Sequence, residues 1–302
     1  MIKSKNITIL GTGISGLGSA KLANKLGLNV FVSDNNIIGE KIKKYLNENK
    51  IGFEENGHDI RRLLSADQVI ISPGISFVDL KKRYPEINKE KFISEIEFAS
   101  RFTNAYLIAV TGSNGKTTTA SLIYHILKSS GFNVGLAGNI GVSFAESVCN
   151  FSYDFYVLEV SSFQLDHISK FRPNISIITN ISADHLDRYD YKFENYVKSK
   201  YRIVKNQKNE DYFIYNRNCI VTKRILKTIK INSKKISFSL SKSQDKHSQI
   251  YLDKNHINSL LNKKKFMLST NKIPIKGKHN LQNSMAAISV AQILKISNEK
   301  IK

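Results

Sequence analysis

The sequence is 302 residues long and carries 46 Lys and Arg against 25 Asp and Glu, a formal net charge of +21. This length favours two domains, and no apolar run approaches the roughly 18 residues of a membrane-spanning helix. Cys149 and Cys219 stand far apart, which argues against a disulfide framework or a zinc site. Because the N-terminus enters a strand without a secretory signal, we expect a cytoplasmic protein.

The positive charge would ordinarily suggest nucleic acid or an anionic surface as partner. Here the lysines are scattered among Asn and Ile, and the dense run is NKKKF at 262–266. No basic motif interleaved with aromatic residues is present. We interpret the charge as a solvated basic surface and expect no nucleic-acid partner; attraction of a polyanionic small molecule, or of nucleic acid, is the alternative.

The first 95 residues predict a parallel, doubly wound sheet. NITIL enters the turn GTGISG at 11–16, which opens a helix with an apolar side, and further strands are predicted at 29–34 and 66–74. Short strands that alternate with helices are typical of α/β domains. We therefore expect a Rossmann-like domain over residues 1–95.

The pattern restarts at residue 96. AYLIAVTG predicts a strand, and KTTTASLIYHILKSSG predicts a helix that ends at Gly131. Residues 220–275 are rich in Lys, Asn and Ser and predict short strands, whereas NLQNSMAAISVAQILKIS predicts an amphipathic helix. Between these segments, further strands are predicted in NVGLAG, FYVLEVSS, ISIITNIS and EDYFIYN. We expect a second α/β domain of the P-loop ATPase type over residues 96–302.

The stretch TGSNGKTTT at 111–119 predicts a phosphate-binding turn between strand and helix. Lys116 would reach the β and γ phosphates, and Thr117 would offer its hydroxyl to Mg²⁺. The spacing is shorter than GxxxxGK[ST], because Val110 stands where that motif has its first glycine. ATP or GTP binding is predicted for Gly112, Ser113, Asn114, Gly115, Lys116, Thr117 and Thr118.

The turn GTGISG, with Asp34 at the end of the next strand, matches the dinucleotide-binding fingerprint. This pattern predicts that a phosphate and a ribose bind here, but it does not indicate whether the ligand also carries a nicotinamide. From these residues alone NAD(P), another nucleotide and a purely structural turn all remain open.

Two acidic segments follow apolar strands of the second domain. Glu159 ends the run FYVLE, where a carboxylate would be costly to bury without a cation. Asp184, His185 and Asp187 follow another strand. Since ligands gather at the carboxyl ends of parallel strands, Glu159 is a candidate metal ligand; His185 is either a ligand or a loop histidine.

Several motifs in order resemble one family, the ATP-dependent Mur ligases of peptidoglycan synthesis. Together they cover essentially the whole chain, and SSFQLD and DHLDRY are most similar to the D-glutamate-adding members. The motifs are GTGISGLG, SPGIS, VTGSNGKTTT, AGNIG, LEVSSFQLD, NISADHLDRY, KSKYRI and GKHNLQN.

The resemblance implies that the first domain holds the UDP end of the substrate UDP-N-acetylmuramoyl-L-alanine, in place of NAD. The residues implied at the UDP end are Ser15, Gly16, Asp34, Ser72, Pro73 and Gly74. Those implied along the path to the lactoyl-alanine carboxylate are Asn139, Ser161, Gln164 and His185.

The chemistry implied by the resemblance is amide formation through an acyl phosphate, with ATP and D-glutamate as the other substrates. Lys116 would neutralise the phosphates, Thr117 and Glu159 would hold one Mg²⁺, and His185 a second. Lys200 matches a lysine that is carbamylated in the family, which would make it metal-facing. Asn280 and Asn283 would lie against the adenine, and we expect a monomer.

Two departures from the family pattern stand out. SDNN at 33–36 lacks the arginine that often follows the aspartate, and the chain stops near where a third, amino-acid-binding domain would begin. We therefore expect a fragment that lacks the C-terminal domain, and that binds both nucleotides but ligates poorly. An NAD(P)-dependent oxidoreductase and a non-catalytic nucleotide-binding fragment are the alternatives.

Overall fold

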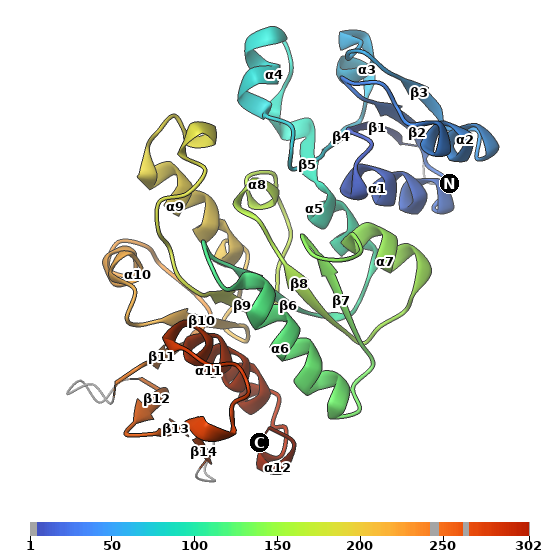
Figure 1. The fold of residues 1–302 in the computed structure, drawn as a ribbon. Helices are drawn as coiled ribbons and strands as arrows, with labels where there is room; N and C mark the ends of the chain where they lie inside the picture. The colour runs from blue at the N-terminus through green and yellow to red at the C-terminus, as the bar shows by residue number, and fades with distance from the viewer. Residues whose placement is uncertain (1–4, 242–247, 262–265, 302) are drawn as a thin grey trace. The chain divides into compact units, whose positions relative to one another are not determined.

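The computed structural model describes residues 5–241, 248–261 and 266–301 (Figure 1). The chain divides into two compact units. The first comprises Met1–Asn104, Gly141–Ser152 and Phe163–Phe171, and the second comprises Ala105–Ile140, Tyr153–Ser162 and Arg172–Lys302. Residues 262–265 of the basic run NKKKF lie outside the described residues.

This division differs from the sequence-based boundary between residues 95 and 96, because buried side chains of helix α5 (Glu95–Ala99) bind later segments of the chain. The carboxylate of Glu97 is fully buried and accepts the backbone N–H groups of Ser169, Lys170 and Phe171 at 2.6–2.9 Å. Tertiary hydrogen bonds of this kind leave no periodic pattern in the sequence.

The sheet of the first unit has five parallel strands in the order β3-β2-β1-β4-β5, which confirms the predicted doubly wound domain. The central position of β1 brings the turns after β1 and β4 to one edge of the sheet, where ligands of such folds bind. The strands are β1 (Asn6–Leu10), β2 (Asn29–Ser33), β3 (Gly52–Glu54), β4 (Gln68–Ile71) and β5 (Phe92–Ser94).

Helices surround this sheet, and α1 lies against β1 and β2. Helix α7 also belongs to this unit: it packs on α1 and α5, and Lys21 of α1 forms an ion pair with Glu146 of α7. The α-helices that lie wholly in this unit, besides α5, are α1 (Ile14–Lys25), α2 (Glu40–Glu48), α3 (Ile60–Ser65), α4 (Phe77–Arg83) and α7 (Phe144–Asn150).

The second unit has a nine-stranded mixed sheet in the order β14-β13-β12-β11-β10-β9-β6-β8-β7. It is parallel from β7 to β12, whereas β13 pairs antiparallel with β12 and β14. The strands are β6 (Tyr106–Thr111), β7 (Val134–Gly138), β8 (Phe155–Glu159), β9 (Ile175–Ile178), β10 (Tyr212–Asn216), β11 (Lys234–Ser239), β12 (Ile250–Asp253), β13 (His256–Ser259) and β14 (Phe266–Ser269).

Helix α6 packs on β6, β7 and β8 and on α11. The prediction of an amphipathic helix near the C-terminus is wrong in one respect: α11 is buried on every side from Asn283 to Gln292, because it packs against α6 as well as β10, β11 and β12. The helices of this unit are α6 (Lys116–Ser129), α9 (Phe193–Tyr201), α10 (Ile220–Ile225), α11 (Lys278–Ile293) and α12 (Asn298–Ile301). The short α8 (Ser162–Leu165) begins in this unit, and its last three residues belong to the first unit.

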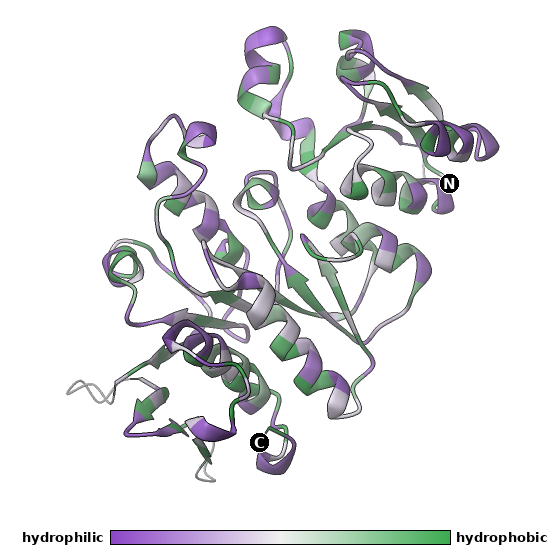
Figure 2. Ribbon diagram, in the orientation of Figure 1, coloured by the Kyte–Doolittle hydropathy of each residue, from purple (hydrophilic) through white to green (hydrophobic). Residues whose placement is uncertain are grey.

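The core of the second unit lies where α6 and α11 cover the middle strands. Buried side chains such as Ile108, Val157 and Ile177 of the sheet meet Ile123 of α6 and Met285 of α11. Figure 2 shows the middle strands in apolar colours, whereas α6 carries both colours. Burial of this apolar surface is the main stabilising contribution to such a unit.

No helix in the described residues is long and apolar enough to cross a membrane. Cys149 and Cys219 form no disulfide with each other in this structure.

Candidate functional site

The turn predicted to hold phosphate lies between the end of β6 and the start of α6. Gly115 has a φ of +79°, and a Cβ atom at this position would lie 2.4 Å from Asn283 Oδ1. Glycine is therefore required both by the backbone and by the packing of α11. Because the turn leads into the N-terminus of a 14-residue helix, its N–H groups and the helix dipole favour an anion.

The ammonium of Lys116 lies over this turn. Its Nζ atom donates hydrogen bonds to the carbonyl oxygens of Gly112 at 3.0 Å and Ser113 at 2.9 Å. The positive charge is thus held at the turn that would cradle the phosphates, which is where the sequence predicts it.

The other side of the turn is fixed by the residues that follow β9. The carbonyl oxygen of Asn114 accepts hydrogen bonds from Thr179 Oγ1 at 2.6 Å and Asn180 Nδ2 at 2.9 Å, and the N–H of Asn114 donates to Asn180 Oδ1 at 3.0 Å. Thr118 lies in the first turn of α6. A turn tied on both sides loses little conformational freedom when it binds a ligand.

A buried carboxylate lies beside the first turn of α6. Glu159 ends β8 between β6 and β7 and is 3% exposed. Its Oε2 atom accepts a hydrogen bond from Thr117 Oγ1 at 2.7 Å, and its Oε1 atom accepts one from Asn139 Nδ2 at 2.9 Å. Asn139, which the resemblance places on the substrate path, therefore binds Glu159 in this structure.

This donor set fits a magnesium ion. Among the described residues no Lys or Arg forms an ion pair with Glu159, and burial of a carboxylate without a cation costs several kcal/mol. Mg²⁺ prefers oxygen ligands and is commonly held by one or two carboxylates together with nucleotide phosphates. The described residues contain no cluster of three His, Cys, Asp or Glu side chains that could hold a metal alone, so phosphate oxygens would have to complete the shell.

Lys200 is a second lysine that binds the turn, and it contacts the same carbonyl oxygen as Lys116. It is 2% exposed, and its Nζ atom donates to the carbonyl oxygen of Gly112 at 2.9 Å. The ring of Tyr196 lies beneath this ammonium, with 4.5 Å between Nζ and the ring centroid. Sequence analysis missed Tyr196 and predicted no helix over this segment. Its spacing of four residues before Lys200 on α9, where side chains share a face, is the signal that could have found it.

His185 adopts a left-handed backbone conformation with a φ of +49°, and its side chain is 56% exposed. Its Nε2 atom lies 3.6 Å from Asp184 Oδ2. His185 is the residue that directly precedes the 3-10 helix Leu186–Tyr189. Its role as a ligand of a second metal stays a prediction.

The amides of the two α11 asparagines predicted to contact adenine bind protein groups, and Asn283 lies against Gly115 of the turn. Asn283 Oδ1 accepts a hydrogen bond from Thr119 Oγ1 at 3.2 Å, and its Nδ2 donates to Asn280 Oδ1 at 3.3 Å. Asn280 Nδ2 donates to the carbonyl oxygen of Lys276 at 2.8 Å. Asn283 thus packs against the turn and the first turns of α6. The contact of Asn280 and Asn283 with adenine stays a prediction.

The glycine turn of the first unit joins β1 to α1. A Cβ atom on Gly16 would lie 1.8 Å from the carbonyl oxygen of Gly11, so the start of α1 can approach the turn only because residue 16 is glycine. Ser15 lies in the first turn of this helix. The strand, turn and helix have the arrangement that binds nucleotides in many βαβ units, and nucleotide binding by this turn stays a prediction.

Asp34 holds the same turn. Its Oδ2 atom accepts hydrogen bonds from the backbone N–H and the hydroxyl of Thr12, both at 2.7 Å, and its Oδ1 atom accepts the N–H of Asn36 at 2.9 Å. Burial alone would raise the pKa of Asp34, but these hydrogen bonds outweigh it and lower the pKa. The carboxylate therefore stays charged and orders the turn.

The turn SPG follows β4, the neighbour of β1. The hydroxyl of Ser72 is buried beside Gly11 and Gly16 and has no hydrogen-bond partner among the described residues. Pro73 and Gly74 come next in this turn. The predicted UDP-binding residues of the first unit therefore gather at the carboxyl ends of three adjacent parallel strands, β2, β1 and β4.

Ser161 and Gln164 lie in the segment that follows β8. Ser161 is half-buried, whereas Gln164 is 1% exposed and belongs to the first unit. Their roles toward the substrate stay predictions.

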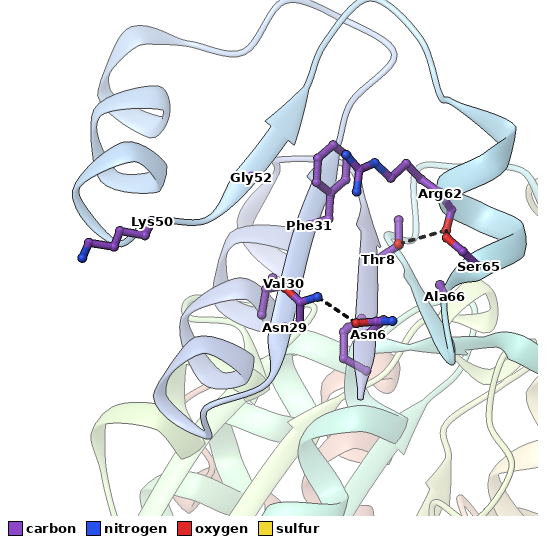
Figure 3. A pocket seen from close by; sticks show the side chains of 11 residues that line it. Asn6, Thr8, Asn29, Val30, Phe31, Lys50, Gly52, Arg62, Ser65 and Ala66 are labelled. Atoms are coloured by element: carbon purple, nitrogen blue, oxygen red, sulfur yellow. Dashed lines mark hydrogen bonds between the residues drawn. The ribbon is translucent and has the colours of Figure 1, made fainter. Parts of the chain in front are cut away.

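A pocket of about 310 Å³ lies elsewhere in the first unit (Figure 3). It opens at the amino ends of β1 and β2, and the guanidinium of Arg62 covers the ring of Phe31 at 4.2 Å from the centroid. Asn29 Nδ2 donates to Asn6 Oδ1 at 2.7 Å along its lower wall in Figure 3. None of the predicted site residues lines this pocket, so it is distinct from the glycine turn at the other end of the strands.

Two family models match the chain. The model of the Mur ligase middle domain matches residues 110–291, and that of the MurD N-terminal domain matches residues 6–79. The first match contains the P-loop turn, Glu159 and Lys200, and the second contains the glycine turn and Asp34.

Curated relatives carry one common name, UDP-N-acetylmuramoylalanine–D-glutamate ligase. The relative from Christiangramia forsetii is 44% identical over 99% of this chain, and the relative from Bacteroides fragilis is likewise 44% identical over 99%. The chain spans 66% of the length of each of these relatives.

Solved structures share the fold. The UDP-N-acetylmuramate:L-alanyl-gamma-D-glutamyl-meso-diaminopimelate ligase from Neisseria meningitides matches with a TM-score of 0.63 at 20% identity, over 98% of this chain and 96% of that one. UDP-N-acetylmuramate-alanine ligase MurC from Thermotoga maritima matches with a TM-score of 0.55 at 19% identity, over 98% and 67%. With both domain models in chain order and relatives at 44% identity, this chain belongs to the Mur ligase family.

Proposed function

We propose that this chain provides the sugar-nucleotide-binding and ATP-binding parts of a UDP-N-acetylmuramoylalanine–D-glutamate ligase, acting in peptidoglycan precursor synthesis. Relatives of that name are 44% identical over 99% of the chain. The observation that carries the proposal is the pairing of Thr117 with the buried carboxylate of Glu159, next to the ammonium of Lys116 at a P-loop turn. We also propose that the protein acts as a monomer in the cytoplasm.

The reaction joins a carboxylate to an amine in two steps. An oxygen of the alanyl carboxylate attacks the γ-phosphorus of ATP, ADP leaves, and an acyl phosphate forms. The amine of D-glutamate then attacks the acyl carbon through a tetrahedral intermediate, loses a proton, and phosphate leaves as the amide bond forms. Both steps bring anions together, so positive charge at the phosphates lowers the barrier.

The side chains have distinct parts in this scheme. The ammonium of Lys116 would contact the β and γ phosphates. The N–H groups of the turn would donate to phosphate oxygens, and the dipole of α6 would favour their negative charge. Thr117 and Glu159 would hold Mg²⁺, which screens phosphate charge and polarises the γ-phosphoryl group when bound. From the family resemblance, His185 and a carbamylated Lys200 would contact a second Mg²⁺.

The glycine turn of the first unit would bind the UDP end of the substrate. A Rossmann-like turn alone is equally compatible with NAD(P), and the match of residues 6–79 to the MurD N-terminal domain supports UDP. Titration of the chain with UDP-N-acetylmuramoyl-L-alanine and with NAD⁺ separates the two. Binding of the first alone supports the ligase, and binding of NAD⁺ alone would support an oxidoreductase.

The first half-reaction can be tested without D-glutamate, because hydroxylamine can take the place of the amine. The chain is incubated with UDP-N-acetylmuramoyl-L-alanine, Mg-ATP and hydroxylamine, and the hydroxamate of the substrate is sought by mass spectrometry. We expect an ATP-dependent hydroxamate, absent from Lys116→Ala. Binding of both nucleotides with no hydroxamate would contradict the acyl-phosphate proposal.

A further inference from the structure

One histidine lies at the ligand edge of the first unit, although it belongs to none of the motifs described above. His58 is in the loop between β3 and α3, and its Nδ1 atom lies 2.6 Å from Ser33 Oγ at the end of β2. Because Ser33 is fully buried, this contact holds the imidazole ring at the carboxyl end of β2. Ligands of open α/β sheets bind outside this edge.

The loop that carries His58 is itself held in place. The N–H of Gly57 donates to the carbonyl oxygen of Asp34 at 3.2 Å, and the N–H of Asp34 donates to the carbonyl oxygen of Glu54 at 3.1 Å. In addition, the hydroxyl of Tyr84 donates to the carbonyl oxygen of His58 at 2.9 Å. The loop is therefore ordered before a ligand binds, which lowers the conformational cost of binding.

The second ring nitrogen is available to a ligand. Among the described residues, the Nε2 atom of His58 forms no hydrogen bond, whereas Nδ1 is taken up by Ser33. The side chain is half-buried, and burial lowers the pKa of His58 despite the nearby carboxylates of Glu54 and Asp34. The ring is therefore neutral at pH 7, with one donor and one acceptor nitrogen.

The order of the strands indicates which part of a sugar nucleotide would meet this nitrogen. With phosphates at the glycine turn after β1, a ribose hydroxyl would bind the acid at the end of β2, as in dinucleotide sites. The carboxylate of Asp34 accepts three hydrogen bonds, from Thr12 and Asn36, and a carboxylate has about four acceptor positions. One position therefore remains for the ribose.

The base is the group that follows the ribose. The next strand after β2 in the sheet is β3, and neighbouring strands lie about 4.8 Å apart. A base that continues in the direction from β1 to β2 would therefore lie at the loop after β3, which carries His58.

We propose that His58 binds the uracil base of the sugar nucleotide through its Nε2 atom, beside a ribose held by Asp34. The inference rests on the proposed function, which assigns UDP to the glycine turn, and it adds the residue that recognises the base. The Watson–Crick edge of uracil carries an N–H group between two carbonyl oxygens. It therefore offers a hydrogen-bond partner to Nε2 in either tautomer of the ring.

Calorimetric titration with UDP-N-acetylmuramoyl-L-alanine compares the wild type with two variants. His58→Leu removes both ring nitrogens. Loss of one hydrogen bond corresponds to about a fivefold change in an equilibrium, so this variant should bind about fivefold more weakly. His58→Gln places an amide within similar reach and should retain most of the affinity. His256→Leu is the matched control: this histidine is also half-buried but belongs to β13 of the second unit, and its replacement should leave the affinity unchanged.

A second readout follows the imidazole itself, by nitrogen-15 NMR of the seven histidines. The resonances of His58 are those missing from the spectrum of His58→Gln. A new hydrogen bond should move the Nε2 resonance when UDP is added. Ribose 5-phosphate has no base, so it should leave this resonance in place at concentrations that displace UDP. A role of His58 in folding alone would give no such difference between the two ligands.

The outcomes separate the inference from the proposed function. If the wild type binds neither UDP-N-acetylmuramoyl-L-alanine nor UDP, the assignment of UDP to the glycine turn fails, and the role of His58 fails with it. If the wild type binds, equal affinity in His58→Leu or an Nε2 resonance that UDP does not move would overturn the role of His58 alone. If His58→Leu does not fold, the NMR comparison on the wild type decides.

Discussion

Glu95→Gln should remove a pH dependence of stability that arises inside the first unit. The carboxyl group of Glu95 is completely buried, and its Oε1 atom accepts the backbone N–H of Ala145. Its Oε2 atom has no hydrogen-bond partner among the described residues. Burial therefore raises the pKa of Glu95 to about 7, against the lowering effect of the hydrogen bonds from Ala145 and Phe144.

The magnitude follows from this pKa. Between pH 4.5 and 7 the folded protein binds the proton of Glu95 more tightly than the unfolded chain does, so the free energy of unfolding falls as the pH rises through this window and is level above it. At about 1.4 kcal/mol per pKa unit, the rise from 4.5 to about 7 corresponds to about 3 kcal/mol. A carboxamide does not titrate, so the free energy of unfolding of Glu95→Gln does not fall with pH on account of this residue.

The assay is thermal unfolding of the wild type and Glu95→Gln from pH 4.5 to 8. Because the sequence has no Trp, circular dichroism and calorimetry follow the transition. The stability of Glu95→Gln relative to the wild type should rise by about 3 kcal/mol across the range, or about 10 °C in Tm. Glu90→Gln, which replaces an exposed carboxylate of the same unit, should follow the wild-type curve. Parallel curves for Glu95→Gln and the wild type would refute the reasoning.

Two further substitutions test the second unit. Gly115→Ala should destabilise the protein by about 1–3 kcal/mol, because a Cβ at a φ of +79° meets Asn283 Oδ1. An unchanged Tm in thermal unfolding would contradict this, because it would mean that the turn and α11 can move apart without cost. Lys200→Ala should lower ligase activity in a protein that includes the D-glutamate-binding part, and short carboxylic acids should partly restore it. Full activity in Lys200→Ala would remove Lys200 from the metal site.

The sequence was sufficient to predict those parts of the candidate sites whose geometry depends on local backbone structure. The P-loop turn was predictable because glycines, a lysine and a hydroxyl residue must follow a strand and open a helix. The same holds for the glycine turn at 11–16, and for Glu159, because an acid at the end of an apolar strand must face the ligand edge of the sheet.

Contacts between distant segments were not predictable. Asn139 binds Glu159, and Asn283 packs under Gly115, but neither pairing leaves a periodic pattern. The burial of α11 on every side and the assignment of residues 141–152 to the first unit depend equally on tertiary packing. The contact of Tyr196 with Ser113, with 3.0 Å between the two hydroxyl oxygens, joins segments 83 residues apart and leaves no local pattern either.

The central claim is that the turn at 111–119 binds the triphosphate of ATP together with Mg²⁺. Calorimetric titration of Mg-ATP into the wild type and Lys116→Ala tests it most directly, with circular dichroism as the control for folding. Because Lys116 supplies the charge held over the turn, the account predicts saturable, Mg²⁺-dependent binding by the wild type and no measurable binding by a folded Lys116→Ala. Equal affinity in the two proteins, or no binding by the wild type, would contradict it.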